Sequence, residues 1–138
     1  MRVAIVNGPN INLLGSRETQ VYGTLKFEDY YKRLVKQYPD ITFTHFQSNI
    51  EGELIDKIQF FDKDYDAIIL NAAAYTHTSV GIRDAISGIS IPVIEVHISN
   101  VWSRESFRHT SLISPVVKGV IAGFGLESYK LAIMSLMR

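Results

Sequence analysis

The sequence predicts an α/β protein in which helices cover both faces of a five-stranded parallel sheet. Short runs of β-branched residues alternate along the chain with segments whose apolar residues recur at helical spacing. The chain has 138 residues, of which 46% are hydrophobic. A chain of this size buries roughly 70% of the surface that it exposes when unfolded. We therefore expect a single domain over residues 1–138.

Composition excludes several classes of function. The 14 basic and 14 acidic residues balance to a formal net charge of zero, so no overall field attracts nucleic acid or a membrane. The chain has no cysteine, which excludes disulfides, thiolate metal sites and thiol catalysis. The apolar run that starts at residue 3 is too short for a signal peptide or a membrane span. We expect a cytoplasmic protein whose partner is a small molecule or another copy of itself.

The first half of the chain predicts two strands and two helices. Residues 2–7 form an uninterrupted apolar strand, and residues 8–24, with three glycines and a proline, form an aperiodic lid over a site. A helix follows, and it ends before Pro39. Its apolar stripe consists of Phe27, Tyr30, Tyr31, Leu34, Val35 and Tyr38. Residues 41–46 alternate apolar and polar side chains, as expected near a sheet edge, and a helix begins near Glu51 and ends near Asp62.

The second half continues the same alternation. Strands are predicted over residues 66–71, 92–97 and 116–122, and helices over residues 80–89 and 126–137. Thr76 or Thr78 is expected to cap the helix that starts at residue 80. Short strands joined by helices form right-handed crossovers, which place the helices on both faces of the sheet.

Five such strands predict a flavodoxin-like three-layer sandwich with strand order 2-1-3-4-5. In this order, the turns after strands one, three and four open on one side of the sheet. These turns, over residues 7–17, 71–79 and 95–100, are unusually polar. We therefore expect their side chains to converge on one site.

Several chemistries of such a site can be weighed from the residues. The sequence contains neither a Walker A motif nor a dinucleotide glycine motif, and Asn71 stands where a receiver domain would carry an aspartate. A metal cluster of His77, Asp84, Glu95 and His97 is a minor alternative, because the spacing is not diagnostic. No lysine lies in the three turns, so an imine mechanism lacks an obvious nucleophile.

Single residues of the three turns leave both a structural and a functional interpretation open. His97 could be a hydrogen-bonded structural histidine or an acid-base catalyst, although Glu95 leaves the same face of the strand and could support its imidazole. Tyr22 could be a packed loop aromatic, Arg17 a solvated charge and Asn10 a turn former. Their joint presence on converging turns favours a functional site.

Several ordered motifs resemble the type II 3-dehydroquinate dehydratases. They are Asn7-Gly8-Pro9-Asn10-Ile11-Asn12-Leu13-Leu14-Gly15, Arg17, Tyr22-Gly23, Asn71, Thr76-His77-Thr78-Ser79, Arg83-Asp84-Ala85, Glu95-Val96-His97-Ile98-Ser99-Asn100 and Phe107-Arg108. The match runs from about residue 3 to residue 133. The resemblance implies one catalytic domain that reversibly dehydrates 3-dehydroquinate to 3-dehydroshikimate in aromatic biosynthesis, without metal, cofactor or Schiff base.

The resemblance also implies roles for individual residues. Tyr22, activated by Arg17, removes the proton beside the ketone, and Asn10 stabilises the enolate through a bound water. His97, supported by Glu95, then protonates the departing hydroxyl. The implied substrate-binding residues are Asn71, His77, Ile98, Ser99 and Arg108, together with Asp84 from a neighbouring subunit of a homododecamer, a tetramer of trimers. Arg104 is expected in the electrostatic surroundings of the site.

Two other classes of function fit the same turns. One is a flavodoxin-like domain that binds an anionic small molecule without this chemistry, and the other is a structural subunit with an inactive site. The second requires a missing catalytic group, and each type of group that the resemblance implies is present.

Overall fold

The computed structural model describes residues 1–16 and 18–137. Its sheet has five parallel strands in the order β2-β1-β3-β4-β5, which confirms the predicted topology. The strands are β1 (Arg2–Asn7), β2 (Thr42–Gln47), β3 (Ala67–Asn71), β4 (Val93–His97) and β5 (Gly119–Ala122).

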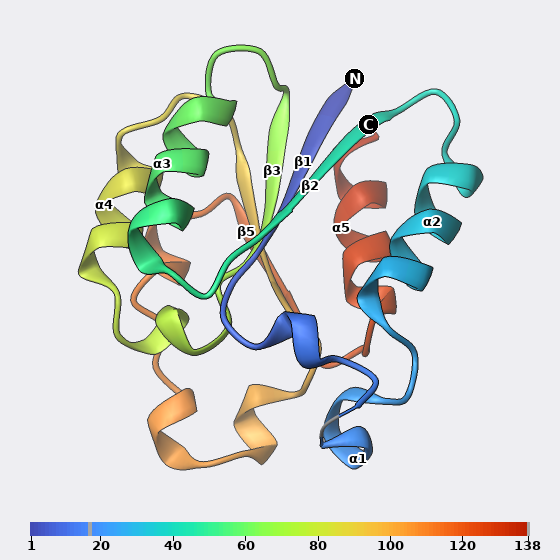
Figure 1. Cartoon of the computed structure of the whole chain (residues 1–138). Coiled ribbons are helices and arrows are strands. Elements are labelled where there is room, and N and C mark those ends of the chain that lie inside the picture. Colours follow the sequence, from blue (N-terminus) through green and yellow to red (C-terminus); the bar gives the residue numbers. More distant parts are fainter. Residues whose placement is uncertain (17, 138) are drawn as a thin grey trace.

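Two pairs of helices cover the two faces of this sheet (Figure 1). One pair is α2 (Phe27–Gln37) and α5 (Glu127–Leu136), and the other is α3 (Glu51–Phe61) and α4 (Val80–Ser87). The architecture is therefore the three-layer α/β sandwich that the sequence predicts. Among the described residues, no helix has both the length and the apolar character needed to cross a membrane.

The side chains of β1 show how the sequence forms two cores. Val3 and Ile5 pack in the cluster with α2 and α5, whereas Ala4 and Val6 pack in the cluster with α3 and α4. Successive residues of a strand point to opposite faces, so a strand buried on both sides must be apolar at every position. The edge strand β2 is only partly buried, in agreement with its alternating sequence.

Three local expectations differ from the structure. Ser79, rather than Thr76 or Thr78, caps α4, because its hydroxyl accepts a hydrogen bond from the amide of Ile82 at 2.9 Å. Val35 is 40% exposed, since it lies at the border of the apolar stripe of α2. The segment predicted as an aperiodic lid contains two helical turns, η1 (Ile11–Leu13) and α1 (Thr19–Tyr22).

Gly8 brings the turns after β1 and β3 into direct contact. Asn7 is paired with Asn71 in the sheet, and the amide of Gly8 donates to the carbonyl of Asn71 at 2.7 Å. A Cβ atom at position 8 would lie 2.5 Å from the carbonyl oxygen of Ala72. Only glycine allows this approach, and it places the two polar turns side by side.

Candidate active site

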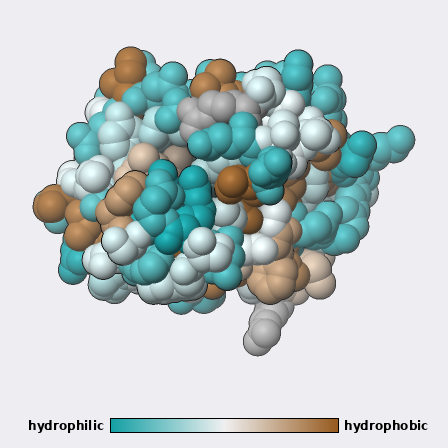
Figure 2. Space-filling model, turned by 90° about the horizontal axis from the view of Figure 1, so that it is seen from below, coloured by the Kyte–Doolittle hydropathy of each residue, from teal (hydrophilic) through white to brown (hydrophobic). Residues whose placement is uncertain are grey.

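A pocket lies at the carboxyl ends of the strands, where the three polar turns meet. Figure 2 views this end of the molecule, on which polar side chains surround a few apolar ones. The lining residues are Pro9, Asn10, Ile11, Leu13, Leu14, Tyr22, Asn71, Ala73, Ala74, His77, His97, Ile98, Ser99, Val101, Arg104 and Arg108. The predicted convergence of the turns is therefore confirmed.

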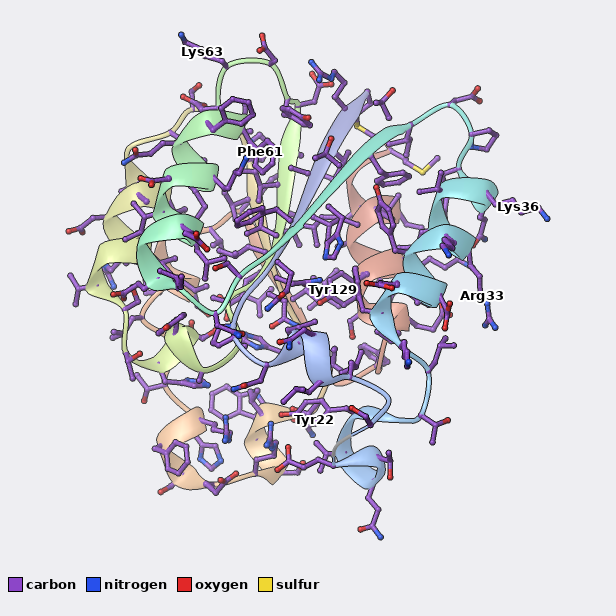
Figure 3. All side chains as sticks on the ribbon, in the orientation of Figure 1. Tyr22, Arg33, Lys36, Phe61, Lys63 and Tyr129 are labelled. Carbon is purple, nitrogen blue, oxygen red and sulfur yellow. The ribbon has the colours of Figure 1, made fainter. Side chains whose placement is uncertain are left out.

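Tyr22 reaches the pocket from α1, below the sheet in the orientation of Figure 3. Its hydroxyl oxygen accepts a hydrogen bond of 2.7 Å from Nη1 of Arg104, and the guanidinium carbon lies 5.2 Å from the centre of the tyrosine ring. Arg104 also donates to the hydroxyl of Ser99 at 3.3 Å. A guanidinium remains charged at any physiological pH, so the phenolic oxygen faces a permanent cation.

His97 and Glu95 form a buried pair at the end of β4. Nε2 of His97 lies 2.5 Å from Oε2 of Glu95, and both residues are less than 10% exposed. Burial alone would raise the pKa of Glu95, but hydrogen bonds from His97, Ser114 and Ser111 outweigh it and hold that pKa below its usual range. The ionised carboxylate accepts from Nε2, which leaves Nδ1 of His97 for the pocket.

In His77 the protein holds the other ring nitrogen, Nδ1, whereas in His97 it holds Nε2. Its Nδ1 donates to the carbonyl of Thr110 at 2.8 Å, and among residues 1–16 and 18–137 its Nε2 has no hydrogen-bond partner. Burial lowers the pKa of His77, and the nearby charges of His97 and Arg108 lower it further against the hydrogen bond to Thr110. His77 is therefore neutral near pH 7, and its Nε2 can accept a hydrogen bond. Its ring is stacked on that of His97 with 6.5 Å between centroids.

The remaining residues that line the pocket lie in the segments that follow β1 and β4. Asn10 adopts a left-handed conformation with φ of 70°, and its backbone amide donates to the side-chain Oδ1 of Asn49 at 3.0 Å. Ile98 and Ser99 follow β4 directly and line the pocket. Arg108, in η4 (Ser106–Arg108), also lines the pocket and donates from Nε to Glu105 at 3.0 Å. This hydrogen bond is the main reason that the pKa of Glu105 is lowered.

Two predicted site residues are not part of this group. Asp84 is exposed on α4 and lines a different cavity, with Ile55 and Gln59 among its neighbours. Arg17 lies outside the described residues. Across the described part of the chain, no three histidine, aspartate or glutamate side chains come together as a metal site would require.

The structure adds residues that sequence reasoning did not place. Arg104 was expected only in the surroundings, yet it makes the direct contact with Tyr22 across 82 positions of sequence. Ser111 and Ser114 hold Glu95, although nothing in their local sequence distinguishes them from ordinary loop serines. Tyr129 belongs to the apolar pattern of the terminal helix but donates a hydrogen bond to Asn7 and accepts one from Asn71.

The fold and the pocket together define a flavodoxin-like α/β protein with a polar pocket at the carboxyl ends of its strands. The chain belongs to the class II dehydroquinase family, whose model, Dehydroquinase class II, matches residues 1–137.

Individual proteins agree with this assignment. The chain is 52% identical to the 3-dehydroquinate dehydratase of a Nitratiruptor species, with 99% of this chain and 88% of that protein covered. It is 54% identical to the 3-dehydroquinate dehydratase of an Exiguobacterium species, with 99% and 94% covered. Among solved structures, the type II dehydroquinase from Butyrivibrio crossotus superimposes with a TM-score of 0.95 at 45% identity, with 100% of this chain and 98% of that chain covered.

Proposed function

We propose that this protein is a hydro-lyase that reversibly converts 3-dehydroquinate to 3-dehydroshikimate and water in the shikimate pathway. Family membership over residues 1–137 supports the reaction. The observation that carries the mechanism is that a tyrosine held by an arginine and a histidine held by a glutamate line the same pocket. Together they supply a base and an acid for an elimination.

In the first step, Tyr22 acts as the base. A tyrosine is normally protonated near neutral pH, so it needs a nearby cation to act as tyrosinate. Arg104 lies at hydrogen-bond distance from the phenolic oxygen, and the family resemblance also assigns this activation to Arg17. The tyrosinate takes the proton from the carbon beside the ketone, which leaves an enolate. Asn10 stabilises the enolate oxygen through a bound water.

In the second step, His97 acts as the acid. Glu95 holds Nε2, so the proton comes from Nδ1 on the pocket side of the ring. The carboxylate balances the positive charge of the imidazolium before it gives up this proton. The proton passes to the departing hydroxyl, the carbon–oxygen bond breaks, and the enolate electrons form the double bond of the enone. Water leaves, and the starting state returns when Tyr22 gives its proton to solvent and Nδ1 of His97 takes one up.

The other pocket residues bind the substrate. Asn71 and the backbone amides of Ile98 and Ser99 bind the carboxylate, which is consistent with their positions on the pocket wall. His77 and Arg108 bind ring hydroxyls, and Nε2 of His77 is suited to accept from one of them because Nδ1 carries the proton that is donated to Thr110.

Asp84 contributes to the site of a neighbouring subunit in a homododecamer built from trimers. The proposal rests on the family resemblance, and it is consistent with the exposed position of Asp84 outside the pocket of its own chain. Closed symmetric assemblies of this kind place the same residue at every equivalent site.

The test is to add 3-dehydroquinate to the purified protein and to follow the absorbance of the enone product. We expect turnover that survives a chelator and leaves no covalent adduct after borohydride treatment. His97→Ala should lose about 10² to 10⁴ in turnover. An inactive wild-type protein would refute the proposed function, whereas loss of activity with chelator or a reduced adduct would refute only the metal-free, imine-free route.

A further inference from the structure

A chain of hydrogen bonds runs through the interior from β2 to the pocket. Nδ2 of Asn7 lies 3.0 Å from Nε2 of His45, and Oδ1 of Asn7 accepts from the hydroxyl of Tyr129 at 2.6 Å. The same hydroxyl oxygen accepts from Nδ2 of Asn71 at 2.9 Å. Oδ1 of Asn71 accepts from the amide of Ala73 at 3.1 Å.

The donor and acceptor roles in this series of hydrogen bonds are fixed from the Ala73 end. The backbone amide of Ala73 can only donate, so Oδ1 of Asn71 faces Ala73 and Nδ2 faces Tyr129. Tyr129 has one hydroxyl proton, which it gives to Asn7. Asn7 must then direct its own amide nitrogen at His45, whose Nε2 has to be an unprotonated acceptor.

The state of His45 agrees with this requirement. Burial lowers the pKa of His45, although the nearby carboxylate of Glu28 raises it in part. Its ring packs against the rings of Phe27 and Tyr31, with centroids 4.6 Å and 5.3 Å away. A neutral ring held in this way accepts a hydrogen bond from Asn7. Every hydrogen bond in the series then donates in the same direction, from Ala73 towards His45.

We propose that Tyr129 is a positioning residue that holds the carboxamide of Asn71 in the orientation in which it meets the substrate. Tyr129 and Asn7 are fully buried, and Asn71 is 3% exposed on the pocket wall, so no bulk water replaces a lost partner. With Oδ1 and one proton of Nδ2 engaged, the second proton of Nδ2 is the donor that remains for an anionic group. The inference rests on the proposed function, because it assigns the origin of substrate binding by Asn71.

Figure 3 shows Tyr129 deeper in the molecule than Tyr22. Tyr129 is fully buried and does not line the pocket, so it touches no substrate and acts on it through Asn71. Its loss should weaken binding in the ground state and the transition state equally, which raises KM and leaves kcat nearly unchanged.

Tyr129→Phe is the direct test, and Tyr30→Phe is its matched control. Tyr30 is also a buried tyrosine, but among residues 1–16 and 18–137 its hydroxyl has no hydrogen-bond partner of regular geometry. We expect Tyr129→Phe to raise KM about tenfold with kcat within about threefold, as for a buried donor left without a partner. Tyr30→Phe should change neither by more than about twofold.

A double-mutant cycle separates positioning from general damage. In an Asn71→Ala background, Tyr129→Phe should raise KM by less than about twofold, because its effect passes through the missing side chain. Equal effects of Tyr129→Phe in the two backgrounds would overturn the inference. His45→Phe keeps the aromatic packing and removes the acceptor for Asn7, so it provides a second, milder variant if Tyr129→Phe does not fold.

A crystal structure provides a readout that does not need activity. In Tyr129→Phe, or in His45→Phe if the former is unstable, the carboxamide of Asn71 should rotate away from its wild-type orientation. An unmoved Asn71 would overturn the inference even if the wild-type enzyme is active. A wild-type protein without turnover but with a rotated Asn71 in the variant would instead count against the proposed function only.

Discussion

Nη1 of Arg104 lies 2.7 Å from the hydroxyl oxygen of Tyr22, although the two residues are 82 positions apart in the sequence. Arg104 follows the short helix η3 (Val101–Ser103) beyond β4, whereas Tyr22 ends α1 after β1. The contact therefore joins the turn after one central strand to the turn after another. It places a permanent cation beside the phenolic oxygen of the proposed base.

This relationship predicts different losses for Tyr22 and Arg104. Tyr22→Phe removes the base, so proton exchange beside the ketone, followed by proton NMR in deuterated water, should fall by about 10² to 10⁴. Arg104→Lys keeps the charge but loses the planar donor geometry, so it should retain more exchange than Arg104→Gln. Arg17→Lys tests the second proposed cation in the same assay.

Near-normal exchange in Tyr22→Phe would contradict its assignment as the base, and Tyr38→Phe is a control on the far side of the fold.

Glu95 predicts the acid dependence of stability. Its pKa is lowered in the folded protein, so its contribution to the free energy of unfolding is present above the ordinary glutamate pKa of about 4.3 and is lost as pH falls through the folded pKa. Glu95→Gln should cost about 1–3 kcal/mol at pH 7, since a buried network is broken.

The difference between wild type and Glu95→Gln should shrink between about pH 5 and pH 3, as measured by thermal unfolding. Asp40→Asn, on an exposed loop, is the control for removing a carboxylate. A difference that stays constant over this range would show that the charge of Glu95 does not stabilise the fold.

Gly8 and Gly52 predict opposite effects of the same substitution. Gly8→Ala places a methyl group 2.5 Å from the carbonyl oxygen of Ala72, so it should destabilise the protein and separate the turns that form the pocket. Gly52 lies in α3 with nothing within 4 Å of an added Cβ atom. Gly52→Ala should therefore stabilise the protein by about 0.5–1 kcal/mol. Chemical denaturation of both variants decides, and equal effects would argue against the close approach at Gly8.

Shared active sites predict that two inactive variants restore each other. If Asp84 acts across a subunit boundary, mixed assemblies of Asp84→Ala and Tyr22→Phe subunits should contain some sites with both wild-type residues. We expect partial recovery of turnover after the subunits are dissociated and reassembled together, with each variant reassembled alone as the control. Light scattering gives the number of subunits, and a fully active monomer would contradict the proposal.

The sequence alone determined the fold and the general position of the site. Hydrophobic periodicity is a local signal, so it located all five strands and the four main helices, with boundaries that shifted by up to three residues. The alternation in residues 41–46 correctly indicated an edge strand, and parallel topology correctly placed the three polar turns at one end of the sheet. The order and spacing of the motifs predicted the family to which the chain belongs.

Only the tertiary structure decided which polar groups act on one another. The contact between Arg104 and Tyr22, the serines that hold Glu95, and the chain from His45 through Tyr129 to Asn71 all join residues distant in sequence. Their side chains have no local pattern that reveals a partner, because hydrogen bonds depend on distance and angle in space and not on separation along the chain. The orientation of each amide and imidazole, and so the atoms offered to a substrate, is set by these contacts.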